Sequence, residues 1–277
     1  MFKINSKNNK KGFSLVELLV GVTIFTVISI SVYTSYTSIF GIIYTSRARL
    51  DAVDLANEQL EIIRNLPYAD VGIYGSIPSG VLAHTQTLVR GSSTFSVTTT
   101  VRNVDDPFDG TLGGAPNDLS PADFTLIEIE INCAGCKNFT PIISTSRVAP
   151  KNLETASTNG ALFVRVFDAN GNPVPDAAVH IVNNVNNPPI TIDDVTNANG
   201  MLQVVDAPPG ADAYDITVSK TGYSTDRTYA PTVANPNPSK PLATVALQQV
   251  TQISFTIDRV STFNVSSVTQ TCTPVPS

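Results

Sequence analysis

The sequence predicts an α+β fold: a long N-terminal transmembrane helix packs on an antiparallel β-sheet head, and a β-sandwich follows. The first observation is an apolar segment at residues 13–44 that is long enough to cross a membrane. The second is its amphipathic continuation as far as Pro67. The third is the change after Pro67 to short alternating segments separated by Gly, Pro and Asn-Gly turns.

Composition and charge narrow the class of protein. The chain of 277 residues has 14% charged residues, 19 prolines and a net charge of −6. Four of its 17 basic residues and none of its 23 acidic residues lie in residues 1–12, so the rest of the chain is strongly acidic. The acidic balance of residues 13–277 argues against general nucleic-acid binding, because phosphate contacts need clustered Lys and Arg. Three cysteines fit neither a disulfide-dense scaffold nor a four-ligand zinc site.

The boundary between the basic and apolar residues lies at Gly12. From Phe13 onward the apolar run contains Glu17 as its one acid or base apart from tyrosines. The run is about 32 residues long, and about 20 suffice to cross a hydrocarbon core. The lysines before Gly12 orient the leader toward the cytoplasm and predict export of the following domains. An ordinary signal peptide has a shorter apolar region and a cleavage site after it, which differs from this arrangement.

The segment Lys11-Gly12-Phe13-Ser14-Leu15-Val16-Glu17 resembles the signal of the type IV prepilin and pseudopilin family. In that family a dedicated peptidase cuts after the glycine and leaves the apolar helix on the mature protein. The resemblance implies a leader at residues 1–12, cleavage between Gly12 and Phe13, and N-methylation of Phe13. It also implies three partners: other pilin subunits, the prepilin peptidase and membrane lipid.

Glu17 has two interpretations. A carboxylate in a membrane helix costs about 2.5–3.5 kcal/mol at the helix centre and less near the interface. The first interpretation is that Glu17 lies at headgroup depth and reaches water. The second, which the resemblance favours, is that Glu17 attracts the N-terminal amine of a neighbouring subunit during assembly. Such a pair would neutralise two charges in the apolar core of a filament.

The helix is predicted to span residues 13–66, with the membrane part at 13–44. Beyond the membrane, one stripe is apolar except for Gln59: Ala52, Leu55, Ala56, Gln59, Ile62, Ile63 and Leu66. Pro67 ends the helix, which would be about 80 Å long at 1.5 Å per residue. Residues 55–67 are also similar to minor pilins of the pilus-modification type.

Residues 67–151 are predicted to form a β-rich head. Alternating patterns predict strands at residues 85–89, 94–104, 124–131 and 140–148, with a loop rich in Gly and Pro at 105–121. Glu128 and Glu130 share one strand face, which we interpret as solvated rather than as an acid/base pair.

Cys133 and Cys136 lie at the tip of the predicted hairpin. A redox CxxC site needs the cysteines at the start of a helix, and none is predicted here. Zinc needs two more ligands, and His84, His180 and Cys272 lack motif spacing. The prediction is therefore a local disulfide between Cys133 and Cys136. Free thiols and a link to Cys272 are the alternatives.

Residues 160–250 are predicted to form a small antiparallel sandwich. Short strands recur about every ten residues, with Asn-Gly turns at 170–171 and 199–200. The motifs from Val164 to Ile181 and from Pro208 to Tyr223 resemble the carboxypeptidase regulatory-like family, an Ig-like, transthyretin-like fold. That family is a non-catalytic module common in surface proteins and adhesins. Residues 251–277 are predicted to add strands to its edge or to begin a further domain.

No metal, cofactor or catalytic residue is predicted. Asp168, Asn170, Asp193 and Asp194 lack the further acidic ligands of a calcium loop, and Asn-Gly turns explain this pattern without an ion. The chain has two histidines, no Gly-x-Ser-x-Gly and no phosphate-binding glycine loop before a helix. An enzyme is therefore not expected.

These features predict a minor type IV pilin or pseudopilin. Such a subunit crosses the cytoplasmic membrane once, exports its C-terminal domains, and joins a surface filament that displays the Ig-like module. The alternative is an adhesin, held at the membrane or filament, whose sandwich binds a glycan or protein ligand. A pilus, a secretion pseudopilus and a DNA-uptake filament fit the sequence equally.

Overall fold

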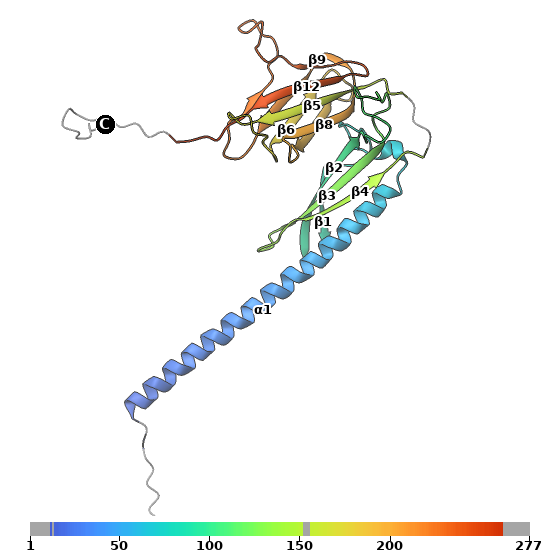
Figure 1. The fold of residues 1–277 in the computed structure, drawn as a ribbon. Coiled ribbons are helices and arrows are strands. Elements are labelled where there is room, and N and C mark those ends of the chain that lie inside the picture. The colour runs from blue at the N-terminus through green and yellow to red at the C-terminus, as the bar shows by residue number, and fades with distance from the viewer. Residues whose placement is uncertain (1–11, 13, 152–155, 263–277) are drawn as a thin grey trace, which may run out of the picture.

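The computed structural model describes residues 12, 14–151 and 156–262. One long helix, α1 (Leu15–Arg64), leads into two β-rich parts, the head and the sandwich (Figure 1). The C-terminal part of α1 lies against the head sheet, while its N-terminal part extends away from the rest of the described chain (Figure 1). This arrangement agrees with the α+β fold that the sequence predicts.

Helix α1 begins and ends close to the predicted residues. Ser14 is its N-cap, Asn65 is its C-cap, and Pro67 follows, so the helix is two residues shorter than predicted at its C-terminus. Its buried residues all lie in the last third: Ala48, Ala52, Leu55, Ala56, Leu60 and Ile63. Two positions differ from the predicted stripe, because Leu60 is buried and Ile62 is 48% exposed.

The head is a four-stranded antiparallel sheet in the order β1-β2-β3-β4. Its strands are β1 (Thr85–Arg90), β2 (Ser93–Val104), β3 (Phe124–Ala134) and β4 (Ile142–Val148), and the one-turn helix η1 (Tyr68–Asp70) precedes them. Buried residues alternate along β2 and β3, as expected when one face of a sheet is covered. The covered face shares one apolar core with the buried side of α1, and it includes Phe95, Ile129 and Cys133.

The sandwich has two sheets. Its strands are β5 (Gly160–Phe167), β6 (Ala178–Asn183), β7 (Ile190–Val195), β8 (Met201–Ala207), β9 (Gly210–Ser219), β10 (Asp226–Arg227), β11 (Ala243–Val245) and β12 (Val250–Thr256). One sheet has the order β10-β9-β6-β7 with β11 paired to β9, and the other has the order β12-β5-β8. Their inner faces form a second apolar core that includes Leu162, Tyr214 and Ile216.

The end of the sandwich differs from the prediction. The predicted sandwich ends at residue 250, but β11 ends at Val245 and the sandwich continues through β12, which begins at Val250 and ends at Thr256. Gln248 adopts a φ of 53° in the turn between them, which redirects the chain. Strand β12 then runs parallel to β5, so this sheet is mixed rather than purely antiparallel. Phe255 and Ile257 are fully buried in the sandwich core, so residues 250–257 are part of it.

The head and the sandwich are in direct contact. The guanidinium of Arg102 in β2 makes two hydrogen bonds of 2.5 Å to the carboxylate of Asp194 in β7. The backbone N–H of Thr191 donates to the carbonyl of Gly75 at 2.7 Å. Ile77 packs against the sandwich core. The position of the sandwich relative to α1 is therefore fixed by polar and apolar contacts together.

Candidate functional site: the uncovered half of the helix

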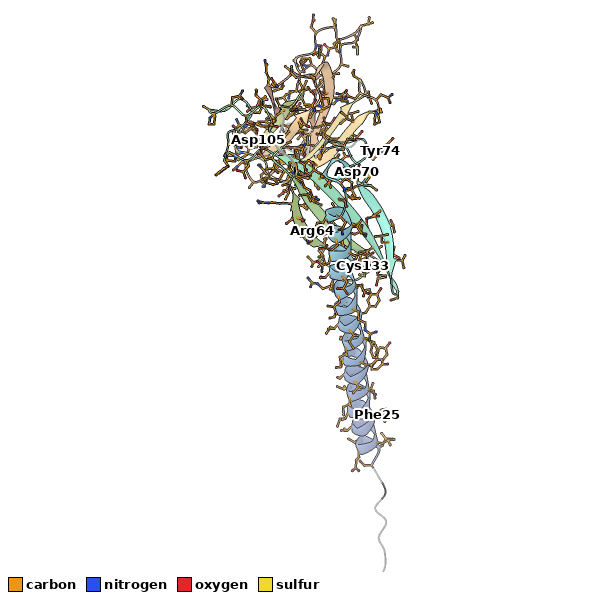
Figure 2. All side chains as sticks on the ribbon, turned by 90° about the vertical axis from the view of Figure 1, so that its right-hand side faces the viewer. Phe25, Arg64, Asp70, Tyr74, Asp105 and Cys133 are labelled. Atoms are coloured by element: carbon orange, nitrogen blue, oxygen red, sulfur yellow. A yellow bond between two sulfur atoms is a disulfide. The ribbon has the colours of Figure 1, made fainter. Side chains whose placement is uncertain are left out.

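The uncovered half of α1, residues 15–43, is a continuous exposed surface made mostly of apolar side chains. Its large apolar side chains are all exposed, from Leu15 at 79% and Phe25 at 71% to Ile43 at 42%. Phe25 projects from the bare helix, whereas Cys133 lies beside the covered part (Figure 2). Of the described helices, α1 alone is long and apolar enough to cross a membrane. A surface this large and apolar requires lipid or protein around it.

The first turn of α1 is built by Ser14 and Glu17. Ser14 has an extended backbone, and its Oγ accepts a hydrogen bond of 3.2 Å from the backbone N–H of Glu17. This is half of a capping box, in which Ser and Glu are three residues apart. The Glu17 carboxylate also lies where the helix dipole favours a negative charge. Glu17 therefore has a local structural role that the sequence interpretation missed, although the Ser-x-x-Glu spacing signals it.

Most serine and threonine hydroxyl groups of the uncovered half donate hydrogen bonds within the helix. Thr23 Oγ1 donates to the carbonyl of Leu19 at 2.8 Å, and Thr26 Oγ1 donates to that of Val22 at 2.8 Å. The same pattern recurs at Ser31, Thr34, Ser35, Thr37 and Thr45. Because these groups already have acceptors, they add little to the cost of placing the helix in lipid.

Glu17 lies at the edge of a shallow hollow on this surface. Leu18, Gly21, Val22 and Phe25 complete the lining, and the volume is about 340 Å³. No ion pair to Glu17 occurs among the described residues. Residues 15–43 carry no other charged side chain. A carboxylate beside an apolar hollow on this stretch of helix is a suitable receptor for one cation on an apolar segment.

The covered part of α1 is held by polar contacts at its rim. Gln86 Nε2 donates to Gln59 Oε1 at 2.8 Å, and Arg64 Nε donates to Ser146 Oγ at 3.0 Å. Arg90 forms an ion pair with Glu58. These contacts join the helix to β1 and β4, so the head fixes the direction in which the uncovered half projects.

The other predicted site residues lie in separate places. Gly12 is exposed ahead of the cap, whereas Phe13 and Cys272 lie outside the described residues. Cys133 and Cys136 are joined by a disulfide with their Cα atoms 5.5 Å apart. The disulfide closes the tip of the hairpin beside the head core.

The two histidines make single structural contacts. His84 Nδ1 lies 3.1 Å from the carbonyl oxygen of Thr99, and His180 Nδ1 lies 2.6 Å from Asp193 Oδ1. They belong to the head and the sandwich respectively, so they share no site.

The acidic residues near the Asn-Gly turns also have separate roles. Asp168 accepts hydrogen bonds from the side chain and backbone of Asn172, which lower the pKa of its carboxyl group. Asp193 contacts His180, and Asp194 contacts Arg102. These carboxylates therefore do not meet around one ion.

The comparisons with known proteins bear mainly on the N-terminal segment. The model of the prokaryotic N-terminal methylation motif matches residues 7–33. No curated protein sequence matches the chain significantly.

Solved structures show only distant likeness. BcpA, the major pilin subunit of Bacillus cereus, aligns over 50% of this chain and 38% of its own, with 16% identity and a TM-score of 0.26. The Bacillus anthracis TIE protein aligns over 65% of this chain and 40% of its own, with 12% identity and a TM-score of 0.28. GBS52, the minor pilin of Streptococcus agalactiae, aligns over 66% of this chain and 92% of its own, with 13% identity and a TM-score of 0.29. TM-scores this low support no conclusion, and this chain spans about two fifths of the first two proteins.

The family match coincides with the site. It covers Gly12, Glu17 and the first part of the uncovered half of α1. The chain therefore carries a prokaryotic N-terminal methylation motif of type IV pilin-like character, which supports a pilin-like subunit anchored by its N-terminal helix.

Proposed function

We propose that the chain is a minor type IV pilin or pseudopilin. It is a non-catalytic subunit that enters the cytoplasmic membrane through α1, joins a surface filament and displays its sandwich there. The observation that carries this proposal is the uncovered apolar half of α1, over which the methylation motif lies. Lipid covers such a surface before assembly, and neighbouring apolar helices cover it afterwards.

The proposal includes cleavage by a prepilin peptidase between Gly12 and Phe13 and N-methylation of Phe13. Gly12 supports this step because it is exposed and lies before the helix begins. A side chain added at Gly12 would meet no atom within 4 Å, and the same holds at Gly21 within α1. Neither position therefore resists a larger side chain by steric clash, so a difference between their variants reports recognition at the cleavage site.

Mass spectrometry of the mature N-terminus tests this step. The unaltered chain and a Gly21→Val control should both begin with N-methylated Phe13, whereas Gly12→Val should keep residues 1–12. An intact Met1 on the unaltered chain, or cleavage beyond residue 30, would contradict the prepilin assignment.

Glu17 is proposed to attract the N-terminal amine of a neighbouring subunit. Its carboxylate has no ion-pair partner among the described residues, and the surface around it is apolar. In an apolar environment each of the two charges would be costly alone, so their pairing favours one axial register between subunits.

A second candidate function is adhesion through the sandwich. It is favoured by the segment between β10 and β11, which exposes Val233 completely and Tyr229 at 46%. The sandwich also lies at the opposite end of the molecule from the uncovered half of α1 (Figure 1).

A Val233→Asp variant separates the two functions. The number of filaments counted by electron microscopy should be the same for this variant and the unaltered chain, whether or not the sandwich is an adhesin. Reduced attachment of cells to glycan or protein surfaces would support adhesion, whereas unchanged attachment would contradict a role for this segment.

A further inference from the structure

Several charged side chains lie where the uncovered half of α1 meets the part that packs on the head. The first four form no ion pair within the described chain: Arg47, Arg49, Asp51 and Asp54. The next charged residues of the helix, Glu58 and Glu61, are paired with Arg90 and Arg64 respectively. The segment 47–54 therefore differs from the rest of the covered part, because its charges have no partner.

Three of these side chains share one side of the helix. At 3.6 residues per turn, Asp51 and Asp54 fall within about 40° of Arg47, on either side of it around the axis. Arg49 falls on roughly the opposite side. The buried residues of this segment fall about 80–140° from Arg47, and they are Ala48, Ala52 and Leu55. Arg47 and Asp54 are exposed and Asp51 is half-buried, so this side is open to another molecule.

A pair within one helix is the simpler explanation for Arg47 and Asp51. Opposite charges four residues apart stabilise a helix by about 0.2–0.5 kcal/mol, and the better order has the acid first. Here the base comes first, and the structure has no ion pair between the two side chains. Both charges are therefore available to a partner outside the helix.

The spacing of these two residues matches the register of the proposed subunit contact. Pairing of the amine at Phe13 with Glu17 of a neighbour shifts one copy by four residues, which is about 6 Å along a helix. Arg47 and Asp51 are also four residues apart. The same shift therefore brings Arg47 of one copy level with Asp51 of the next. Without a shift, like charges would lie beside each other and repel.

We propose that Arg47 of one copy of this chain forms an ion pair with Asp51 of a second copy in the assembled filament. The inference rests on the proposed function, because it uses the register that Glu17 sets. One copy supplies the base and the next supplies the acid, so the contact is head-to-tail and can repeat along a filament. Asp54 lies three residues beyond Asp51 on the same side and keeps a negative charge near Arg47 at a slightly larger shift.

The pair should act on register more than on affinity. Complementary charges across an interface contribute mainly specificity, and opposed like charges are costly. Glu17 and Arg47 are 30 residues apart, which is about 45 Å along the helix. Two charge contacts so far apart fix both the axial shift between two helices and their relative tilt.

Lipid headgroups are the other candidate partner of Arg47, which lies three residues beyond the predicted membrane part. An anionic headgroup would attract Arg47 but would repel Asp51 and Asp54 on the same side. A protein surface that offers both charges complements this side better. The side of α1 that carries Arg47 is therefore assigned to a second copy.

The test exchanges charges between two full-length chains that carry different affinity tags. Arg47→Asp leaves acids at both positions, and Asp51→Arg leaves arginines at both. The measurement is the fraction of each chain in sheared filaments relative to membranes, for each variant alone and for the two co-expressed. Arg49→Asp is the matched control, because Arg49 is exposed and unpaired but lies on the other side of the helix.

Each variant alone should be incorporated about fivefold less than the unaltered chain, because like charges meet at every contact between copies. Co-expression should restore incorporation to within about twofold, because opposite charges meet again where the two chains alternate. A pair within one helix would not be restored, since neither variant has opposite charges at the two positions. Arg49→Asp should be incorporated like the unaltered chain.

Cross-linking in filaments tests the contact directly. Chains with Arg47→Cys and Asp51→Cys, each also with Cys272→Ser, are co-expressed, and their filaments are treated with a short bismaleimide. A product that carries both tags should form. Replacing Arg47→Cys by Arg49→Cys should abolish this product.

Three results would overturn the inference and leave the proposed function intact. They are no recovery on co-expression, a loss for Arg49→Asp equal to that for Arg47→Asp, and no doubly tagged product in filaments. Loss without recovery, together with less Arg47→Asp chain in membranes before assembly, would assign Arg47 to lipid headgroups. Absence of the unaltered chain from sheared filaments would instead contradict the proposed function itself.

Discussion

At the scale of single residues, Glu17 has two local roles in helix α1, and these must be separated from its proposed role in pairing with a neighbouring subunit. Its backbone N–H completes the cap of α1 at Ser14 Oγ, and its carboxylate lies in the first turn, where the helix dipole favours it. Both roles are local and need no second subunit. The proposed pairing with the amine of a neighbouring subunit depends only on the negative charge of the side chain.

Glu17→Gln and Ser14→Ala separate the cap from the charge. Glu17→Gln keeps the backbone donor and removes the charge, whereas Ser14→Ala removes the cap at about 1 kcal/mol and keeps the charge. If charge pairing drives assembly, Glu17→Gln should reduce incorporation into filaments at least about tenfold. Ser14→Ala should reduce it little.

The measurement is the fraction of subunit in sheared filaments relative to the fraction in membranes. Equal loss in both variants would contradict a role in assembly that is specific to the charge of Glu17. Glu17→Asp is the control that keeps the charge.

The disulfide at the hairpin tip gives a second prediction at this scale. It joins residues three apart, so the loop that it closes is short and the loss of unfolded-state entropy is small. Cys136→Ser should lower the free energy of unfolding by about 2 kcal/mol or less. Urea unfolding of the full chain in detergent, with and without reductant, measures this effect. Cys272→Ser should have no effect, and an equal loss would indicate that Cys272 takes part in the pairing.

At the scale of elements, α1 consists of two parts with different environments. From Ala48 onward its buried face packs on the head sheet, whereas every residue from 15 to 43 is exposed. The head can therefore be stable without lipid, while the uncovered half depends on its surroundings.

Two leucines of α1 test this division with the same chemical change. Leu55 is fully buried against the head sheet, and Leu50, five residues earlier, is 67% exposed. Leu55→Ala should destabilise the head by about 2–5 kcal/mol, because it removes buried atoms and leaves a cavity. Leu50→Ala should change the free energy of unfolding by about 0.5 kcal/mol or less. Equal effects in chemical unfolding of the full chain in detergent would contradict the packing of α1 on the head.

Elements also show where sequence patterns are insufficient. Leu60 and Ile62 lie on opposite edges of the predicted stripe, and periodicity alone does not predict which of the two is more deeply buried. The position of the sheet buries Leu60 and leaves Ile62 exposed. Similarly, alternation predicts β12 as a strand, but its parallel pairing with β5 depends on the turn at Gln248.

At the scale of the whole molecule, the contact between head and sandwich decides how the sandwich is presented. Arg102 and Asp194 join strands from the two parts, and the side chain of Asp194 is only 5% exposed. The hydrogen bonds to Asp194 raise the pKa of Arg102, so the pair stays ionised. A buried ion pair of this kind adds little net stability but is costly to break on one side.

Arg102→Met should therefore destabilise the molecule by about 3 kcal/mol, because it leaves Asp194 buried and unpaired. The double variant Arg102→Met with Asp194→Asn should recover part of this loss, which a double-mutant cycle measures. Arg227→Met is the control, because its partner Asp215 lies 3.8 Å away and both side chains are about half exposed. Small-angle X-ray scattering in detergent should show a wider range of head–sandwich orientations for Arg102→Met than for Arg227→Met. Identical curves would contradict the positioning role.

The sequence by itself determined the features that depend on neighbours along the chain. The apolar run, the helix end before Pro67 and the strands of the head follow from local charge, periodicity and Pro, and the structure agrees with the helix and strands within a few residues. The leader stays a prediction from the same local pattern. Only the tertiary structure decided which residues meet across long separations. It paired Arg102 with Asp194 and placed β12 beside β5. The physical reason is that such contacts depend on how sheets and loops pack, which no local pattern specifies.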